Sequence, residues 1–222
     1  MNLFVNNEED AKRALIGTLI ADGHVEKQRT PNGRAMIEIT HTARNLDYLK
    51  FKKQLFEFIP NVECEIKSHN KTTEDKSYEL FRLCTNKNDY ATYYRDNMYQ
   101  VIEGKRIKLF RPEDIEYLSD LGLLLLYLDD GTLRVRYYEG TNRIREIRVR
   151  FCLECFTVKE LNYFQSWLLR RYNIHSGLEK KGKGFNIRLN TQATKQLMEI
   201  FNKYYNLIPS MNYKFTKYYD LS

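Results

Sequence analysis

The sequence lacks an apolar run long enough to cross a membrane. Its longest run, from Leu121 to Leu128, is far below the roughly 20 residues that a transmembrane helix needs. It also lacks an N-terminal signal sequence, and its 4 cysteines show no spacing typical of a disulfide framework. We therefore expect an intracellular protein, cytoplasmic or organellar with the mitochondrion included, and not a secreted one.

A strong excess of one charge is also missing. Lys and Arg number 36 against 29 for Asp and Glu, which gives a formal net charge of +7. This modest basic excess is compatible with a polyanionic partner but does not require one. The hydrophobic fraction of 42%, with 17 Tyr and 12 Phe, is sufficient for one large or two small domains with an aromatic core.

The sequence does contain one pattern twice. ALIGTLIADG (Ala14–Gly23) and LLLLYLDDG (Leu123–Gly131) each place an apolar helical stretch directly before an acid and a glycine. The two acids, Asp22 and Asp130, are 108 residues apart. Two internal copies of one unit are therefore indicated.

The segments that follow each copy repeat as well. An amphipathic stretch, Asn45–Phe58, aligns with Thr157–Arg170 at an offset of 112. A stretch that leads from a strand into a helix, Phe81–Asn86, aligns with Ile187–Gln192 at an offset of 106. Each copy is thus predicted as helix, two strands, helix, two strands, helix, in an α+β fold. We assign residues 1–102 and 115–222 to the copies and residues 103–114 to a linker. The first helix is expected to start at Asn7, with acids in its first turn.

Alternation of apolar and polar residues predicts a strand over Glu146–Cys155 and another around Phe185–Leu189. Arg143 and Arg145 fall on the opposite parity to Arg148 and Arg150. A β-bulge or turn near Glu146 would resolve this conflict.

Two related helices that each end in an acid suggest a pseudo-twofold pair. Gly17 and Ala21 lie on one face of the first helix, where small residues allow a close approach to the second. Their C-terminal ends would then bring Asp22 and Asp130 to neighbouring points. Adjacent carboxylates repel one another unless cations lie between them, and they are typical ligands of Mg²⁺.

With these residues the sequence resembles the LAGLIDADG homing endonucleases, in particular the single-chain members of the omega-intron type with two repeats. The resemblance extends over nearly the whole chain, through FTVKELNYFQSWLLRRY (Phe156–Tyr172) to LIPSMNYK (Leu207–Lys214). It implies two pseudo-symmetric αββαββα repeats. The motif helices would lie between the halves, and the antiparallel sheets would form a saddle over DNA. It also implies that Asp22 and Asp130 share two or three Mg²⁺ ions, and it leaves Asp129 without a role.

There are departures from the family motif. Ile20 stands where the motif has an acid, and Leu125 stands where a small residue is usual. The first departure leaves metal binding unaffected. The second predicts that the helices approach less closely, or in a shifted register around Gly122.

The resemblance also implies one basic catalytic residue per active site, after the last helix of each copy. LIPSMNYK supplies Lys214, and the offset of 106 makes Lys108 its counterpart. Lys105 and Arg106 are close enough in the sequence to remain alternatives and candidate DNA contacts. Their role would be to stabilise charge on the phosphate or to polarise the attacking water.

Arginines are dense along the predicted strands of the second copy. The family's DNA saddle makes them expected contacts to phosphates or guanine edges, although a solvated sheet face is the simpler alternative. The set is Arg134, Arg136, Arg143, Arg145, Arg148, Arg150 and, on the later strand, Arg188.

Two other patterns are interpreted structurally. Cys152 and Cys155 form a CxxC without a second pair, so we favour strand cysteines over a zinc site. His41 is taken as an ordinary polar strand residue rather than a ligand.

The sequence therefore predicts a monomeric endonuclease that makes double-strand breaks in a long, asymmetric DNA target by divalent-metal-dependent phosphodiester hydrolysis. The alternative is a non-cleaving protein on the same fold, either an intron maturase that binds RNA or a DNA-binding regulator.

Overall fold

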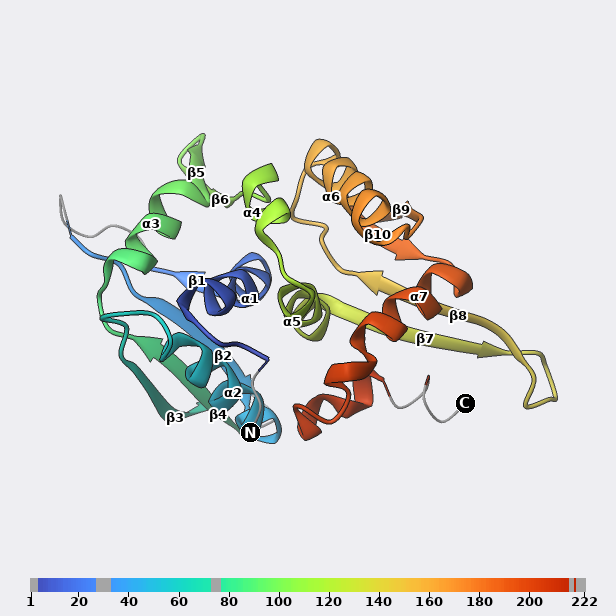
Figure 1. Cartoon of the computed structure of the whole chain (residues 1–222), viewed down its shortest axis with the longest axis horizontal. Coiled ribbons are helices and arrows are strands. Elements are labelled where there is room, and N and C mark those ends of the chain that lie inside the picture. The colour runs from blue at the N-terminus through green and yellow to red at the C-terminus, as the bar shows by residue number, and fades with distance from the viewer. Residues whose placement is uncertain (1–3, 27–32, 73–76, 216–217, 219–222) are drawn as a thin grey trace.

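The computed structural model describes residues 4–26, 33–72, 77–215 and 218, and the repeated order of elements is confirmed within them (Figure 1). The first copy comprises α1 (Glu8–Ile20), β1 (His24–Val25), β2 (Ile37–Thr42), α2 (Leu46–Phe56), β3 (Cys64–Thr72), β4 (Ser77–Thr85) and α3 (Asp89–Asn97). The second comprises α5 (Asp120–Asp130), β7 (Gly131–Tyr137), β8 (Ile144–Phe151), α6 (Val158–Tyr172), β9 (Ser176–Lys181), β10 (Gly184–Leu189) and α7 (Thr191–Phe201). Short 3₁₀ helices follow β2 (η1, Ala43–Asn45) and α7 (η2, Asn202–Tyr204; η3, Pro209–Lys214).

The two copies also share one sheet topology. Each forms an antiparallel sheet of four described strands, in the orders β1-β2-β4-β3 and β7-β8-β10-β9. Helix α2 packs on the first sheet, and α6 and α7 pack on the second, which leaves the other face of each sheet uncovered by its own helices. The predicted mixed α+β fold with antiparallel sheets is confirmed.

Helices α1 and α5 lie side by side at the centre of the molecule, between the two sheets (Figure 1). Their ends follow ordinary capping chemistry. The Asn7 side chain accepts a hydrogen bond from the Asp10 backbone N–H at the start of α1, as expected, and Ser119 caps α5 in the same way. Helix α5 is buried on nearly every side from Leu121 to Leu128, which explains its uniformly apolar sequence.

Close packing between α1 and α5 depends on two glycines. A Cβ atom built on Gly17 would lie 1.9 Å from the carbonyl oxygen of Gly122, and one built on Gly122 would lie 2.4 Å from the carbonyl oxygen of Arg13. The contact therefore uses Gly122, one turn before Leu125. Of the two predicted alternatives, the helices therefore adopt the shifted register around Gly122, and they approach each other closely.

The predicted β-bulge is also present. The pairing of β7 with β8 shifts its register between Arg136 and Tyr137, so that Arg136 faces Glu146, Tyr137 faces Ile144, and Arg145 is left over. The strand differs from its predicted bounds of Glu146–Cys155, because it ends at Phe151. Cys152 and Cys155 therefore lie in the following turn rather than in a strand, and both are free thiols.

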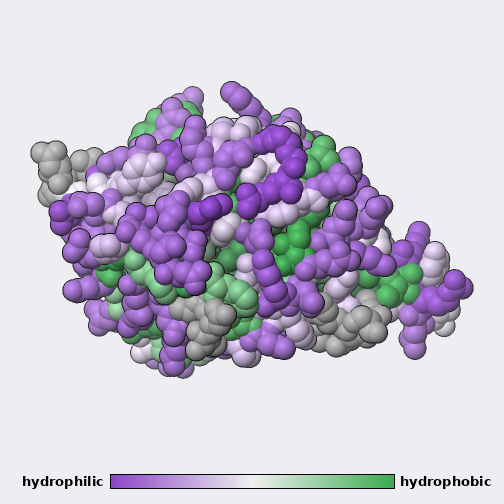
Figure 2. Space-filling model, in the orientation of Figure 1, coloured by the Kyte–Doolittle hydropathy of each residue, from purple (hydrophilic) through white to green (hydrophobic). Residues whose placement is uncertain are grey.

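Residues 103–114, predicted as a linker, form regular structure instead. A hairpin of β5 (Tyr99–Ile102) and β6 (Lys105–Lys108) leads into α4 (Pro112–Tyr117). Glu103 and Gly104 carry positive φ angles of 50° and 74° at its turn. None of the helices in the described ranges is long and apolar enough to cross a bilayer. The face of the molecule in Figure 2 is mostly hydrophilic, with hydrophobic residues in separate patches.

Candidate metal-dependent nuclease site

The two repeated acids lie at the ends of the central helices. Asp22 is in the turn after α1, and Asp130 is the last residue of α5. Burial, followed by the charges of Asp22 and Asp129, raises the pKa of Asp130 to about 7. Desolvation and the charge of Asp129 raise the pKa of Asp22 as well. Burial and the mutual repulsion of the clustered acids therefore both disfavour their ionised forms.

Lys108 reaches the end of α1. Its ammonium Nζ donates to the backbone oxygens of Leu19, Ala21 and Gly23 at 2.8–3.0 Å, and it lies 3.2 Å from that of Ile20. These carbonyls carry the negative end of the helix dipole, so Lys108 caps the helix and fixes the turn that holds Asp22. Burial lowers the pKa of Lys108, while the nearby acids oppose this effect.

Lys214 has the matching place on α5. Its Nζ donates to the carbonyl oxygen of Gly131, the C-cap residue of α5, and its own carbonyl accepts a hydrogen bond from the Tyr127 hydroxyl at 2.7 Å. Burial lowers its pKa, opposed by Asp129 and Asp22. Each helix end thus carries one of the repeated acids and one lysine, and the two lysines are 106 residues apart.

Lys105 and Arg106, the alternatives to Lys108, lie elsewhere. The Arg106 guanidinium donates to the carbonyl oxygen of Val25 at 2.6 Å and stacks 3.6 Å from the centre of the Tyr99 ring. It therefore fastens the β5–β6 hairpin to β1. Lys105 is exposed on that hairpin.

Asp129, to which the sequence assigned no role, is part of a buried polar cluster. Its side chain is fully buried and receives two contacts from the Lys52 ammonium, 2.8 Å and 3.0 Å from its carboxylate oxygens. Thr18 donates to it at 3.0 Å. The Lys52 Nζ also lies 3.1 Å from Nε2 of His41. Burial, and then the charge of Lys52, lower the pKa of His41 to about 3, so its ring is neutral at pH 7 and Nε2 accepts this hydrogen bond.

The interpretation of His41 as an ordinary strand residue therefore missed its neighbours. Potential ligand atoms of Asp22, His41 and Asp129 all lie within 4.8 Å of one another. His41 comes from β2 of the first copy and Asp129 from α5 of the second. A sequence pattern within one copy could not show this contact, because it forms only where the copies meet.

The donor set at the helix ends fits a divalent cation such as Mg²⁺. Carboxylate oxygens are its preferred protein ligands, and the raised pKa values of Asp22 and Asp130 indicate carboxylates that are buried and repelled by neighbouring acids. A bound cation would stabilise both ionised acids.

The arginine-rich strands are β7 and β8, with Arg188 on β10. Arg134, Arg136, Arg145 and Arg188 are exposed on these strands, and Arg143 is exposed in the β7–β8 loop. Arg148 and Arg150 are partly exposed and pair with Glu179 of β9, at 3.4 Å and 2.5 Å respectively.

Acids therefore neutralise part of this face. The hydrogen bond from Arg150, and then the charges of Arg150, Arg148 and Arg188, lower the pKa of Glu179. Glu146 pairs with Arg148 and lies 3.8 Å from Arg136. Glu146 lies among these arginines in the sequence, whereas Glu179 comes from β9, on a different hairpin. A set of exposed arginines on the open face of the second sheet remains.

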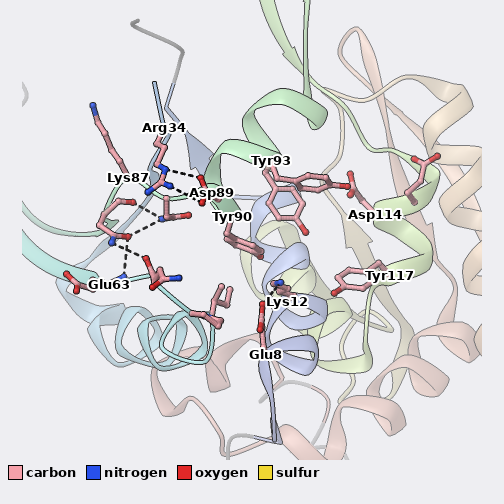
Figure 3. Close-up of a pocket in the computed structure, with 17 residues that line it drawn as sticks. Glu8, Lys12, Arg34, Glu63, Lys87, Asp89, Tyr90, Tyr93, Asp114 and Tyr117 are labelled. Atoms are coloured by element: carbon pink, nitrogen blue, oxygen red, sulfur yellow. Dashed lines mark hydrogen bonds and ion pairs between the residues drawn. The ribbon is translucent and has the colours of Figure 1, made fainter. Parts of the chain in front are cut away.

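A cleft of about 1020 Å³ lies elsewhere, between α1, α3 and α4 (Figure 3). Tyr90, Tyr93 and Tyr117 line it, and Arg34 pairs with Asp89 at 2.9 Å on its rim. Its acids Glu8 and Asp114 also pair, with Lys12 and Arg111. This cleft holds none of the predicted site residues, and three of the five acids that line it are paired with basic side chains.

A family model matches the stretch of sequence that forms both helix ends. The model described as the LAGLIDADG DNA endonuclease family covers residues 12–197. The chain belongs to the LAGLIDADG DNA endonuclease family.

Individual relatives of this LAGLIDADG protein are distant. A cytochrome b mRNA maturase, bI2, from Saccharomyces cerevisiae is 25% identical over 214 residues, which are 92% of this chain and 47% of the maturase. The RecA protein of Mycolicibacterium flavescens is 24% identical over 206 residues, which are 91% of this chain and 45% of RecA. The chain thus spans slightly less than half the length of these curated relatives.

Among solved structures, the homing endonuclease I-WcaI bound to its DNA recognition sequence superposes with a TM-score of 0.75 at 14% identity, covering 95% of this chain and 88% of I-WcaI. At that identity the likeness shows the LAGLIDADG fold.

Proposed function

We propose that this LAGLIDADG protein is a site-specific homing endonuclease that makes double-strand breaks in a long, asymmetric DNA target by divalent-metal-dependent phosphodiester hydrolysis. One observation carries the proposal: each of the two packed helices ends in an acid whose pKa is raised by its surroundings and beside a lysine held at the same helix end. A site with this charge distribution is suited to metal-assisted chemistry on phosphate.

Each copy supplies one acid and one lysine, so one chain suffices for two strands and the protein acts as a monomer. Asp22 and Asp130 hold the divalent ions, which we take to be two or three Mg²⁺ shared between them. Bound there, the ions supply charge stabilisation at the scissile phosphates.

Lys108 and Lys214 keep the turns that carry Asp22 and Asp130 in place. Their positive charges act on the acids from nearby and stabilise negative charge on the phosphate. Lys108 uses its three N–H groups on backbone carbonyls, so it is Lys214 that has donors left to orient the attacking water. Their lowered pKa values place them closer to neutral pH than an ordinary lysine.

The second sheet is the main electrostatic contact to double-stranded DNA. Its exposed arginines Arg134, Arg145 and Arg188, together with Arg143 of the β7–β8 loop, are available for phosphates and guanine edges. Arg136, Arg148 and Arg150 would exchange their acidic partners for DNA on binding. We place the protein inside the cell, in the cytoplasm or an organelle.

Selection of cleaved molecules from a randomised double-stranded DNA library, in Mg²⁺, tests the proposal. One extended asymmetric consensus, cut on both strands, is expected. No enrichment of cleaved molecules in Mg²⁺ or Mn²⁺, with folded and DNA-binding protein, would contradict it. The Asp22→Asn variant serves as the control for contaminating nucleases.

A second function, intron maturation, is favoured by the relative named as a cytochrome b mRNA maturase. It predicts binding to intron RNA that stimulates splicing and survives the loss of Asp22 and Asp130. A splicing assay with Asp22→Asn protein separates the two functions, because it removes only the proposed cleavage activity.

A further inference from the structure

A cationic side chain contacts two members of a group of potential metal-binding residues. The Lys52 ammonium lies 2.8 Å and 3.0 Å from the two carboxylate oxygens of Asp129 and 3.1 Å from Nε2 of His41. These two residues and Asp22 form a group whose ligand atoms lie within 4.8 Å of one another. Lys52 and the carboxylate of Asp129 are fully buried.

We propose that Lys52 is a positioning residue, a built-in cation that takes the place of a metal ion between Asp129 and His41. Both oxygens of Asp129 and the accepting nitrogen of His41 are engaged by this one ammonium group. An ion could enter only by displacing it. The donor atoms available to Mg²⁺ are therefore those of Asp22 and Asp130, and this inference rests on their proposed role as metal ligands.

The contacts around Lys52 are fitted to a fixed cation. The Tyr48 ring centre lies 4.0 Å from Nζ, which adds a cation–π contact on a further side. Thr18 donates to Asp129 at 3.0 Å, so the carboxylate is held from α1 as well. An ion pair without solvent contact requires such additional partners to offset the cost of desolvation.

The cluster also joins the two copies of the fold. Lys52 and His41 belong to the first copy and Asp129 to the second, immediately before the ligand Asp130. The bond therefore fixes the end of α5 relative to the first sheet. It does so without metal, so the acids are already placed when Mg²⁺ arrives.

The second copy has no lysine at the position that aligns with Lys52. At the offset of 112 that aligns α2 with α6, the position of Lys52 is occupied by Phe164, which is fully buried among aromatic rings. At the offset of 108 the position of Asp129 is occupied by Ala21. Lys52 thus serves the shared centre between the copies rather than each site separately.

Counting Mn²⁺ bound to the metal-free protein, through the electron paramagnetic resonance signal of the free ion, tests the inference without DNA or cleavage. His41→Ala is expected to bind as many ions as the unmodified protein. Lys52→Ala is expected to bind one ion more, and the additional ion is lost in the Lys52→Ala/His41→Ala double variant. Lys53→Ala, an adjacent partly exposed lysine, is the matched control and leaves the count unchanged.

Thermal melting gives a second readout. In EDTA, Lys52→Ala is expected to melt about 10 °C lower, because Asp129 loses its partner. Mn²⁺ should raise the melting temperature of Lys52→Ala by more than it raises that of the unmodified protein. The inference is overturned if His41→Ala loses an ion, or if Lys52→Ala binds no additional ion.

Should Lys52→Ala not fold, the paired variant Lys52→Met/Asp129→Leu replaces the ion pair by apolar groups. If this variant folds and binds as many Mn²⁺ ions as the unmodified protein, Asp129 is not a ligand and the inference stands. If it binds one ion fewer, the inference is overturned. An unchanged count in Asp22→Asn and Asp130→Asn would instead refute the proposed metal ligands, a separate failure.

Discussion

The raised pKa of Asp130 predicts that this proposed metal ligand destabilises the metal-free protein. The pKa rises from 3.8 to about 7 in the folded chain, first through burial and then through repulsion by Asp22 and Asp129. Between these two pH values the folded state holds a proton that the unfolded state has released. The free energy of unfolding therefore falls as the pH rises through this window.

The magnitude follows from the shift. Each pH unit inside the window is worth about 1.4 kcal/mol, so the free energy of unfolding loses about 3 kcal/mol between pH 5 and pH 7 through Asp130. Asp130→Asn removes the titrating group and some of the repulsion with little change in shape. In EDTA this variant should be more stable than the unmodified protein at pH 8, with the two curves converging at lower pH.

Urea unfolding in EDTA at several pH values from 5 to 8 measures this difference. Glu139→Gln, which changes an exposed acid in the β7–β8 loop, should follow the unmodified protein throughout. Parallel curves for Asp130→Asn and the unmodified protein would refute the reasoning, and so would a variant that is less stable at pH 8. Added Mg²⁺ should reverse the order, because it stabilises only the protein with both acids.

Three further predictions follow from the helix contact, the lysines and the sheet. Gly17→Ala should cost about 1–3 kcal/mol of unfolding free energy in urea, because its Cβ atom would collide with α5, whereas Gly177→Ala, in open space, should cost little; equal costs would contradict the packing argument. Lys214→Met should slow single-turnover cleavage about 100-fold or more while changing DNA affinity little; equal losses would reduce it to a phosphate contact. Arg188→Ala should lower the slope of log affinity against log salt by about 0.9, and Arg170→Ala on α6 should not; an unchanged slope for Arg188→Ala would remove it from the DNA interface.

Much of the fold was predictable because it depends on local patterns repeated twice. The helix ends at Asp22 and Asp130 follow from apolar stretches that stop at an acid and a glycine, and the bulge near Glu146 follows from a change in strand parity. The register of α1 on α5 was left between two alternatives. The register depends on where the two helix backbones can come into contact, and Gly122 allows that contact because it has no Cβ atom.

The contacts between copies were not predictable in the same way. Lys52 is a lysine in the apolar stripe of α2, with Tyr48, Leu49, Leu55 and Phe56. That placement signals a buried charge needing a partner, but the partner lies 77 residues away on the other copy. Within the second copy, Glu179 neutralises Arg148 and Arg150 from a different hairpin, a contact between distant strands that no local pattern shows.

The most direct test of the central claim uses a plasmid carrying the selected target site. The unmodified protein should convert it to linear DNA in Mg²⁺ and leave it intact in EDTA. Asp22→Asn and Asp130→Asn should each bind the site with unchanged salt dependence yet yield no linear product. Full linearisation by either variant would show that these two acids do not form the metal centre.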